Sequence, residues 1–232
     1  MNAILLAAGF GTRLNCEKTG TPKCLTQING KTMLGYWIEK LSNIGVKKFL
    51  INTHFMSEKV HTFIDNHPKS ADITIFNEKI LLGTAQTVLK NNYFLTSDTF
   101  IVHVDNYCED NLLKMLQFHN KRPKNCIATM LTFRTKEPEK CGIVLQNEQN
   151  VLTNFFEKSS NPPGNVANGA IYLVSKDFNS LITSLKQPED LSLDVISKMN
   201  NMIYCYNSSE VFFDIGTPKN LEKARQRSRK VK

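Results

Sequence analysis

"AILLAAGFGTRL", residues 3–14, is an apolar run that passes directly into a glycine-containing turn and ends next to an arginine. Residues 3–8 predict a buried strand. Gly9 and Gly11 free the backbone for close approach to a ligand, and successive exposed N–H groups in such a turn suit phosphate. An ordinary tight turn also fits G-x-G. The third glycine of a dinucleotide-binding motif and the G-K-[ST] of a P-loop are both missing here, so neither of those folds is supported. The stretch therefore predicts a strand followed by a candidate phosphate loop.

Apolar runs and helix-length periodic segments alternate along the first half of the chain. Strands are expected at 3–8, 47–52, 71–76 and 99–105, and helices at 32–45, 57–67 (with Ser57 as N-cap), 83–95 and 109–120. Such alternation predicts an α/β fold, in which helices cover both faces of a parallel sheet. The later strands have fewer helices between them, so we expect a mixed, mostly parallel sheet.

The second half of the chain is expected to be richer in strands. Strands are expected at 126–133, 141–146, 151–158, 168–175 and 202–206, a helix near 191–201, and a terminal helix opened by Pro218. The loop "SSNPPGN", residues 159–165, is expected to be a long hairpin-like connection between paired strands.

Composition restricts the class of protein. The chain has 232 residues, 41% of them hydrophobic, and a net charge of +8. Basic residues crowd the end of the chain, where a solvated tail is the usual explanation, and no nucleic-acid motif is present. No apolar run approaches the roughly 20 residues of a membrane span, and we expect no cleavable leader before the first strand. We therefore expect a cytoplasmic protein without nucleic-acid or membrane partners, and its six scattered cysteines are expected to be free thiols.

Seven ordered blocks define a resemblance that spans nearly the whole chain. They are "GFGTRL" with the lysine of "TPKCL", "EKILLGTA" (78–85), "HVDN" (103–106), "CGIV" (141–144), "FFEK" (155–158), "ANGAIY" (167–172) and "FFDIGTP" (212–218). The sequence thereby resembles the sugar-1-phosphate nucleotidyltransferases, or NDP-sugar pyrophosphorylases. Within that family, the residues of its motifs are most similar to those of the mannose- and heptose-1-phosphate guanylyltransferases. The resemblance implies one Rossmann-like (GT-A-like) domain over 1–224, with a nucleotide-binding half (about 1–120), a sugar-phosphate half (121–224) and a basic tail (225–232).

The implied reaction is attack of a sugar 1-phosphate oxygen on the α-phosphorus of a nucleoside triphosphate, with release of pyrophosphate. The nucleophile is already an anion, so positioning and charge neutralisation suffice and no general base is needed. The resemblance makes Arg13 and Lys23 the catalytic cations. The competing interpretation of each is a surface ion pair.

Two aspartates are predicted to hold a magnesium ion. Asp105 and Asp214 each end an apolar strand, and strand ends of α/β sheets face the ligand side. Carboxylates, phosphate oxygens and water are the ligands that Mg²⁺ prefers. The competing interpretation is that each aspartate caps the turn that follows it. The resemblance favours the metal site.

The resemblance also implies two sets of binding residues. Those for the nucleotide are Ala7, Ala8, Gly9, Gly11, Thr12, Arg13, Glu78, Gly83, Thr84 and Asp105. Those for the sugar phosphate are Asn106, Gly142, Glu157, Lys158 and Asn168.

The substrates are therefore expected to be an NTP and a sugar 1-phosphate, and the protein is expected to form a homodimer. GTP is the favoured nucleotide, and UTP, dTTP or CTP is the alternative. A nucleotide-binding regulatory pseudo-enzyme is the non-enzymatic alternative, and its sign would be loss of a catalytic charge. Because the chain ends soon after residue 218, we expect one activity and no appended acetyltransferase domain.

Overall fold

The computed structural model describes residues 1–229, so the last three residues of the basic tail lie outside the described residues. The chain divides into two compact units, each built from separate stretches. The first unit comprises Met1–Leu81, Val102–Glu109 and the chain from Val211 onward. The second unit comprises Leu82–Ile101 and Asp110–Glu210.

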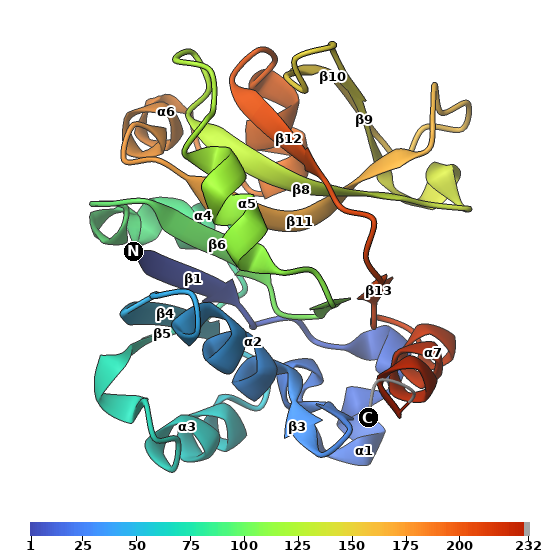
Figure 1. Ribbon diagram of the computed structural model, residues 1–232. Helices are drawn as coiled ribbons and strands as arrows, with labels where there is room; N and C mark the ends of the chain where they lie inside the picture. The colour runs from blue at the N-terminus through green and yellow to red at the C-terminus, as the bar shows by residue number, and fades with distance from the viewer. Residues whose placement is uncertain (230–232) are drawn as a thin grey trace. The chain divides into compact units, whose positions relative to one another are not determined.

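The first unit is built on three parallel strands, β1 (Asn2–Leu6), β4 (Lys48–Thr53) and β5 (Ile73–Asn77). Helix α2 (Met33–Ser42) connects β1 to β4, and α3 (Ser57–Asp65) connects β4 to β5 (Figure 1). Residues 3–6 of β1 and 49–53 of β4 are buried without alternation, as expected of strands covered on both faces. Parallel pairing places the carboxyl ends of all three strands at one edge.

Helix α2 confirms its predicted apolar face, because Met33, Leu34, Trp37, Ile38 and Leu41 are all buried. Its N-cap is Thr32, whose hydroxyl accepts a hydrogen bond from the N–H of Gly35 at 3.1 Å.

The cap predicted for α3 is wrong, because Ser57 is the first helical residue. Met56 precedes it in the left-handed conformation (φ 50°) and no side chain caps the helix. A methionine at positive φ is uncommon, and composition gives no warning of it.

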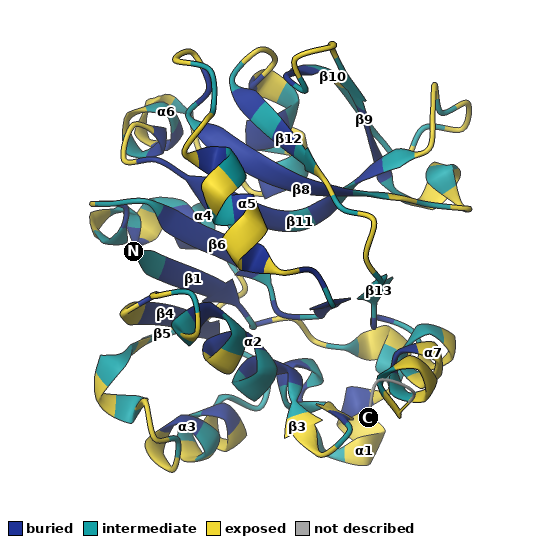
Figure 2. Cartoon of the chain, in the orientation of Figure 1, coloured by how far each residue is buried: buried dark blue, intermediate teal, exposed yellow. Residues whose placement is uncertain are grey.

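Within residues 1–229, the first unit also contains nine smaller or peripheral elements. They are η1 (Thr12–Leu14), α1 (Cys16–Thr19), η2 (Lys23–Leu25), β2 (Gln27–Ile28), β3 (Lys31–Thr32), η3 (Ser70–Asp72), β7 (Asn106–Cys108), β13 (Phe212–Asp214) and α7 (Pro218–Arg229). The predicted terminal helix is thus confirmed, and it includes residues 225–229 of the basic segment. Figure 2 shows α7 largely exposed, whereas β1 and β4 are buried.

The second unit contains a mixed group of strands. They are β8 (Ala128–Arg134), β9 (Gly142–Gln146), β10 (Leu152–Glu157), β11 (Val166–Val174) and β12 (Ile203–Asn207). Strand β11 pairs antiparallel with β8 and β9, β9 pairs antiparallel with β10, and β12 pairs parallel with β8. The expectation of a hairpin at 159–165 is therefore wrong, because β9 lies between the two strands that this loop connects.

The helices of the second unit are mostly short. They are α4 (Thr84–Lys90), η4 (Asn92–Phe94), α5 (Leu112–His119), η5 (Pro138–Lys140), α6 (Phe178–Ser184), the π-helical η6 (Leu191–Val195) and η7 (Ile196–Lys198). Strand β6 (Thr99–His103) runs from the second unit into the first. The expected α/β fold with a mixed, mostly parallel central sheet is confirmed. No helix within residues 1–229 is long and apolar enough to cross a membrane.

A buried histidine makes the stability of the second unit sensitive to acid. The His119 ring is completely buried, and its Nδ1 lies 2.7 Å from the hydroxyl of Thr129. Burial, and then the charge of Arg122, lower the pKa of His119 to about 4, although Asp98 opposes the shift. Below a pH of about 6.5, His119 binds a proton in the unfolded chain but stays neutral in the folded protein. The free energy of unfolding therefore falls as the pH decreases.

We expect this histidine to cost roughly 2–4 kcal/mol of unfolding free energy between pH 6.5 and pH 4. Urea unfolding of the wild type and of His119→Gln at several pH values measures it. The variant should lose the part of the wild-type pH dependence that His119 contributes, so its stability should fall less steeply than that of the wild type in this window. Parallel pH profiles would contradict the assignment.

Candidate active site

The glycine loop after β1 has the geometry that requires glycine at its second position. Gly11 has φ 64° and precedes η1, and a Cβ atom there would lie 2.3 Å from the Sγ atom of Cys16. Gly9 is exposed, and no atom lies within 4 Å of the position that its Cβ would take. Thr12 and Arg13 are exposed in η1, whereas Ala8 is buried. The loop is thus anchored at one end and open at the other.

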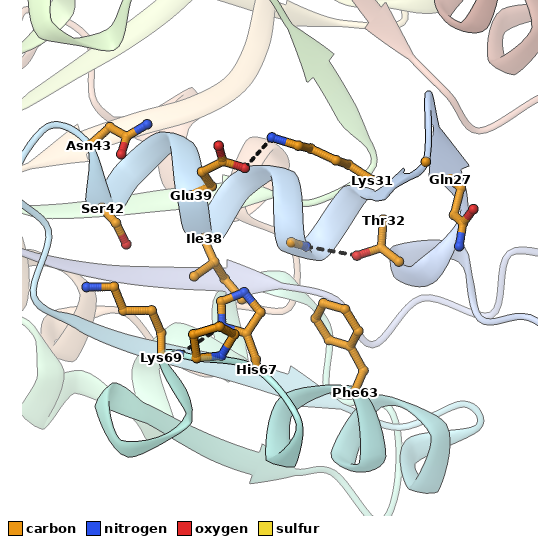
Figure 3. Close-up of a pocket in the computed structure, with 13 residues that line it drawn as sticks. Gln27, Lys31, Thr32, Ile38, Glu39, Ser42, Asn43, Phe63, His67 and Lys69 are labelled. Atoms are coloured by element: carbon orange, nitrogen blue, oxygen red, sulfur yellow. Dashed lines mark hydrogen bonds and ion pairs between the residues drawn. The ribbon is translucent and has the colours of Figure 1, made fainter.

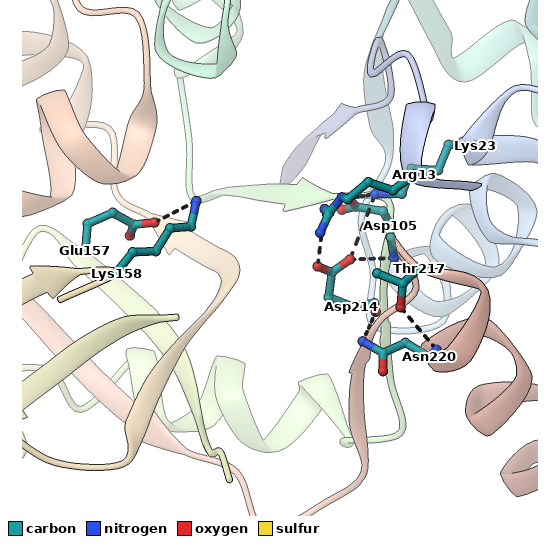
Figure 4. Close-up of polar contacts among 9 residues, drawn as sticks. Arg13, Lys23, Asp105, Glu157, Lys158, Asp214, Thr217 and Asn220 are labelled. Carbon is teal, nitrogen blue, oxygen red and sulfur yellow. Dashed lines mark hydrogen bonds and ion pairs between the residues drawn. The ribbon is translucent and has the colours of Figure 1, made fainter. Parts of the chain in front are cut away.

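The two predicted cations and the two predicted metal ligands form one cluster in the first unit (Figure 4). The ammonium of Lys23 donates a hydrogen bond to Oδ2 of Asp105 and lies 3.9 Å from Oδ1 of Asp214. The guanidinium of Arg13 lies 3.9 Å from Oδ2 of Asp214. Two cations from the loop region after β1 and two acids from distant parts of the chain are therefore brought together, as the sequence predicted.

Backbone pairing explains why the two aspartates meet. Asp105 lies two residues after the end of β6 and directly before β7. Strand β13 pairs antiparallel with β7, so that Asp214 lies opposite Asn106. The N–H of Ile215 also donates to the carbonyl of Asp105 at 2.9 Å. Asn106 is buried behind the cluster, and its carbonyl accepts from the indole N–H of Trp37 at 2.9 Å. Asn106 is thus held next to Asp105 and opposite Asp214, and its predicted contact with substrate stays a prediction.

Gly216 closes the cluster from the side of α7. Its N–H donates to Oδ1 of Asp214 at 2.7 Å, so Asp214 also caps its own turn. A Cβ atom at this position would lie 2.8 Å from Arg13 Nη2 and 3.1 Å from Lys23 Nζ. The turn-cap interpretation of Asp214 is therefore confirmed, and the same turn holds its carboxylate near the two cations. Its role as a metal ligand stays a prediction.

Electrostatics keep Asp105 ionised. Burial alone would raise its pKa, but the charge of Lys23, the nearby His103 and the hydrogen bond from Lys23 outweigh that effect and lower the pKa of Asp105 below its usual range. The Lys23 side chain is only 13% exposed, whereas Arg13 is 66% exposed. The lysine is therefore held in place, and the arginine is accessible to a ligand.

Two hydrogen bonds through Asn52 connect the glycine loop to Glu78. The N–H of Ala7 donates to Oδ1 of Asn52 at 2.7 Å, and Nδ2 of Asn52 donates to Oε1 of Glu78 at 2.8 Å. Both Asn52 and Glu78 are buried. Sequence reasoning missed Asn52, although a polar residue near the end of the buried strand β4 was a usable signal.

An exposed aromatic residue lies beside these hydrogen bonds. Phe10 is 45% exposed, and its ring centroid lies 5.3 Å from that of His54, edge to face. His54 Nδ1 is in turn 2.8 Å from the carbonyl oxygen of Glu78. Sequence reasoning also missed Phe10 and His54.

In the second unit, the predicted nucleotide residues Gly83 and Thr84 pack against the segment before η6. A Cβ atom on Gly83 (φ 87°) would lie 2.5 Å from the carbonyl oxygen of Glu189. The hydroxyl of Thr84 accepts from the N–H of Leu191 at 2.8 Å. The glycine is thus required by a close backbone approach, and Thr84 opens α4.

The predicted sugar-phosphate residues of the second unit lie on adjacent strands. Gly142 pairs with Glu157, and a Cβ atom at Gly142 would lie 2.6 Å from Oε2 of Glu157. The ammonium of Lys158 is 3.4 Å from Oε1 of Glu157, and the Lys158 side chain is 68% exposed. These three residues are therefore brought together, with the lysine available to an anion.

Asn168 lies on β11, beside Ala167, which pairs with Ile143 of β9. Its Nδ2 donates to the hydroxyl of Tyr172 at 2.7 Å, and its Oδ1 accepts from the N–H of Ala170 at 2.8 Å. The amide is thereby oriented by a local irregularity of the strand.

The cluster in the first unit fits a divalent cation that brings further ligands with it. Asp105 and Asp214 offer the carboxylate oxygens that a hard cation prefers. Within residues 1–229, no group of three or more histidine, cysteine or acidic side chains is placed to hold a metal ion. The remaining ligands would therefore come from phosphate oxygens and water.

A family model of nucleotidyl transferases matches residues 2–230 of this chain. The chain belongs to the nucleotidyl transferase family. Its fold is that of nucleotidyl transferases over its full length. It matches a UDP-glucose pyrophosphorylase complexed with UDP-glucose with a TM-score of 0.82, at 17% identity, over 100% of this chain and 99% of that one. It matches HddC from Yersinia pseudotuberculosis, complexed with GMP-PN, with a TM-score of 0.78, at 21% identity, over 97% and 98% of the two chains.

Curated sequences agree with this membership of the nucleotidyl transferase family. The catalytic subunit beta of mannose-1-phosphate guanylyltransferase from Dictyostelium discoideum is 27% identical over 228 residues, which cover 94% of this chain and 62% of that relative. This nucleotidyl transferase spans between 47% and 62% of the length of the first four curated relatives that it matches.

Proposed function

We propose that this nucleotidyl transferase transfers a nucleotidyl group from an NTP to a sugar 1-phosphate and releases pyrophosphate. The observation that carries the proposal is the convergence of Lys23 and Arg13 on Asp105 and Asp214. Such a cluster suits phosphoryl-type chemistry, in which cations neutralise the charge that develops on phosphate oxygens. All four charges are present, which argues against the regulatory pseudo-enzyme.

Each cation has a distinct part in this proposal. Arg13 is exposed, and its planar guanidinium can hold two oxygens of the departing pyrophosphate. Lys23 lies against the carboxylates and supplies a point charge for the α-phosphate.

We assign the metal to Mg²⁺, held by Asp105 and Asp214. When bound, it would neutralise and orient the phosphate oxygens. The fit rests on the hard oxygen donors of the two acids and on the need for additional phosphate ligands.

We propose GTP as the nucleotide because Glu78 presents a buried carboxylate to the loop region. Guanine offers two adjacent donors, N1–H and N2–H₂, whereas the matching edge of uracil or thymine offers one donor between two acceptors. A carboxylate only accepts hydrogen bonds, so the carboxylate of Glu78 matches the two adjacent donors of guanine better than the mixed edge of uracil or thymine. The curated guanylyltransferase relatives support the same choice.

A direct experiment tests the reaction and the nucleotide together. Release of pyrophosphate is measured with GTP, UTP, CTP, ATP and dTTP against a panel of sugar 1-phosphates, mannose and heptose phosphates included. We expect Mg²⁺-dependent turnover, fastest with GTP. No turnover with any pair would contradict the reaction, and a preference for UTP or dTTP would contradict only the assignment of the base.

Lys158 is proposed to hold the phosphate of the acceptor sugar. We expect Lys158→Ala to raise the KM for the sugar 1-phosphate about 10- to 100-fold, with a smaller effect on kcat, because one charge-assisted hydrogen bond is lost. Lys140→Ala is the matched control, since this exposed lysine pairs with Glu137 and has no proposed role. Equal KM values for the two variants would contradict the assignment.

Cytoplasmic location is proposed from the chemistry of these substrates and from the six free cysteines, which suit a reducing compartment. The homodimer and the absence of a nucleic-acid partner stay predictions.

A further inference from the structure

A cavity of about 630 Å³ lies in the first unit, against helix α2. None of the predicted site residues lines it. Its volume lies within the roughly 300–1,000 Å³ of small-molecule sites. Its walls come from α2, from the end of α3 with the turn that follows, and from the turn between β2 and β3.

The apolar wall of the cavity carries two rings. Phe63 and His67 have ring centroids 5.7 Å apart, and Figure 3 shows them opposite Ile38 of α2. Gly35 allows this approach, because a Cβ atom there would lie 3.3 Å from the Phe63 ring. Burial and the charge of Lys69 lower the pKa of His67, which keeps its ring neutral near pH 7. This wall suits a flat ring.

The polar rim of the cavity favours an anion. Lys31 at the rim is paired with Glu39 at 2.6 Å, so these two charges compensate each other. Lys69 also lines the cavity, and its ammonium forms no ion pair with any residue that the structure describes. An uncompensated ammonium beside a flat apolar wall matches a ligand that joins a ring to an acidic group.

Helix α2 connects the cavity to the acidic cluster. One face of the helix lines the cavity through Ile38. From another face, the Tyr36 hydroxyl donates to the carbonyl of Cys108, and the Trp37 indole donates to the carbonyl of Asn106, next to Asp105. A ligand that shifts α2 would therefore shift the strand that follows Asp105.

The same helix also contacts the segment that carries Lys23. The N–H of Met33 donates to the carbonyl of Thr26, directly after η2, at 3.0 Å. One packed helix thus adjoins the cavity and the supports of both the acidic and the basic members of the cluster.

We propose that this cavity is an effector site for a small anion that carries a flat ring, and that binding there is transmitted through α2 to the cluster of Lys23 and Asp105. The site is separate from the proposed substrate residues. The ligand class includes nucleoside monophosphates and simple aromatic acids, which share the ring and the anionic group.

The single tryptophan of the chain provides a direct test. The indole N–H resonance of Trp37 is followed by NMR during titration with phenyl phosphate. We expect a saturable shift that inorganic phosphate and cyclohexyl phosphate do not produce. Lys69→Ala and Phe63→Ala should each weaken binding about tenfold or more. Lys47→Ala, an exposed lysine outside the cavity, should leave it unchanged.

Titration of the wild type and of Lys69→Ala with GMP and with benzoate distinguishes nucleoside monophosphates from simple aromatic acids as the ligand. The proposal is overturned if phenyl phosphate gives no saturable shift, or if the shift survives unchanged in Lys69→Ala. It is also overturned if bound phenyl phosphate leaves the turnover of an active enzyme unchanged. Because the indole signal needs no substrate, failure of the proposed reaction would not be mistaken for failure of this site.

Discussion

Asp105→Asn is expected to lower turnover roughly 10²- to 10³-fold while the protein stays folded. The substitution preserves the shape of the side chain and removes the charge that binds Lys23. An amide is a weak ligand for a magnesium ion, and it no longer orients the ammonium for the α-phosphate. Asp214→Asn should have a similar effect, because its carboxylate approaches both Lys23 and Arg13.

Steady-state pyrophosphate release at saturating Mg²⁺ measures this loss, and thermal unfolding checks the fold. Asp72→Asn is the matched control in the same unit, since Asp72 forms only an exposed ion pair with Lys48 at 3.2 Å. Turnover within a few fold of the wild type in Asp105→Asn would refute the role of this residue. If Asp105→Asn does not fold, Asp214→Asn provides the test, because the Asp214 side chain is 47% exposed and its substitution disturbs the fold less.

The sequence predicted the convergence of the aspartates for a physical reason. Each follows a short apolar run, which suggested two parallel strands whose ends meet at one edge. In the structure, however, β13, which ends at Asp214, pairs antiparallel with β7. The direct cause of their proximity was less accessible, because β7 and β13 are three residues long and show no clear periodicity. The pairing that places Asp214 opposite Asn106 is a long-range contact that a local pattern does not contain.

Other features depended on contacts that no local pattern specifies. The loop 159–165 has strong turn chemistry, but which strand lies between its flanking strands is decided by the packing of β9. Asn52 lies within a strand predicted as apolar, and its role is visible only when Ala7 and Glu78 are seen on either side of it. The cavity beside α2 likewise requires the position of α3.

The hydrogen bonds from Ala7 through Asn52 to Glu78 give the second large prediction, a change of base preference. In Glu78→Gln, the amide oxygen still accepts from Asn52, so the local fold should persist. The amide nitrogen, however, becomes a donor facing the donors of guanine. We expect kcat/KM for GTP to fall roughly 10²-fold, since a buried polar group is left facing a like partner. An amide pairs with the donor and acceptor of uracil or thymine. The kcat/KM for UTP and dTTP should therefore fall far less than that for GTP, or rise.

The informative quantity is the ratio of kcat/KM for GTP to that for UTP, measured with the same sugar 1-phosphate in the wild type and the variant. A ratio cancels general damage to folding or to the phosphate cluster, because both nucleotides share the triphosphate. Glu58→Gln, an exposed change in the first turn of α3, serves as the control and should leave the ratio unchanged. If Glu78→Gln lowers kcat/KM for GTP and for UTP by the same factor, Glu78 supports the loop through Asn52 without contacting the base. Guanine selection would then have to come from the backbone of the glycine loop.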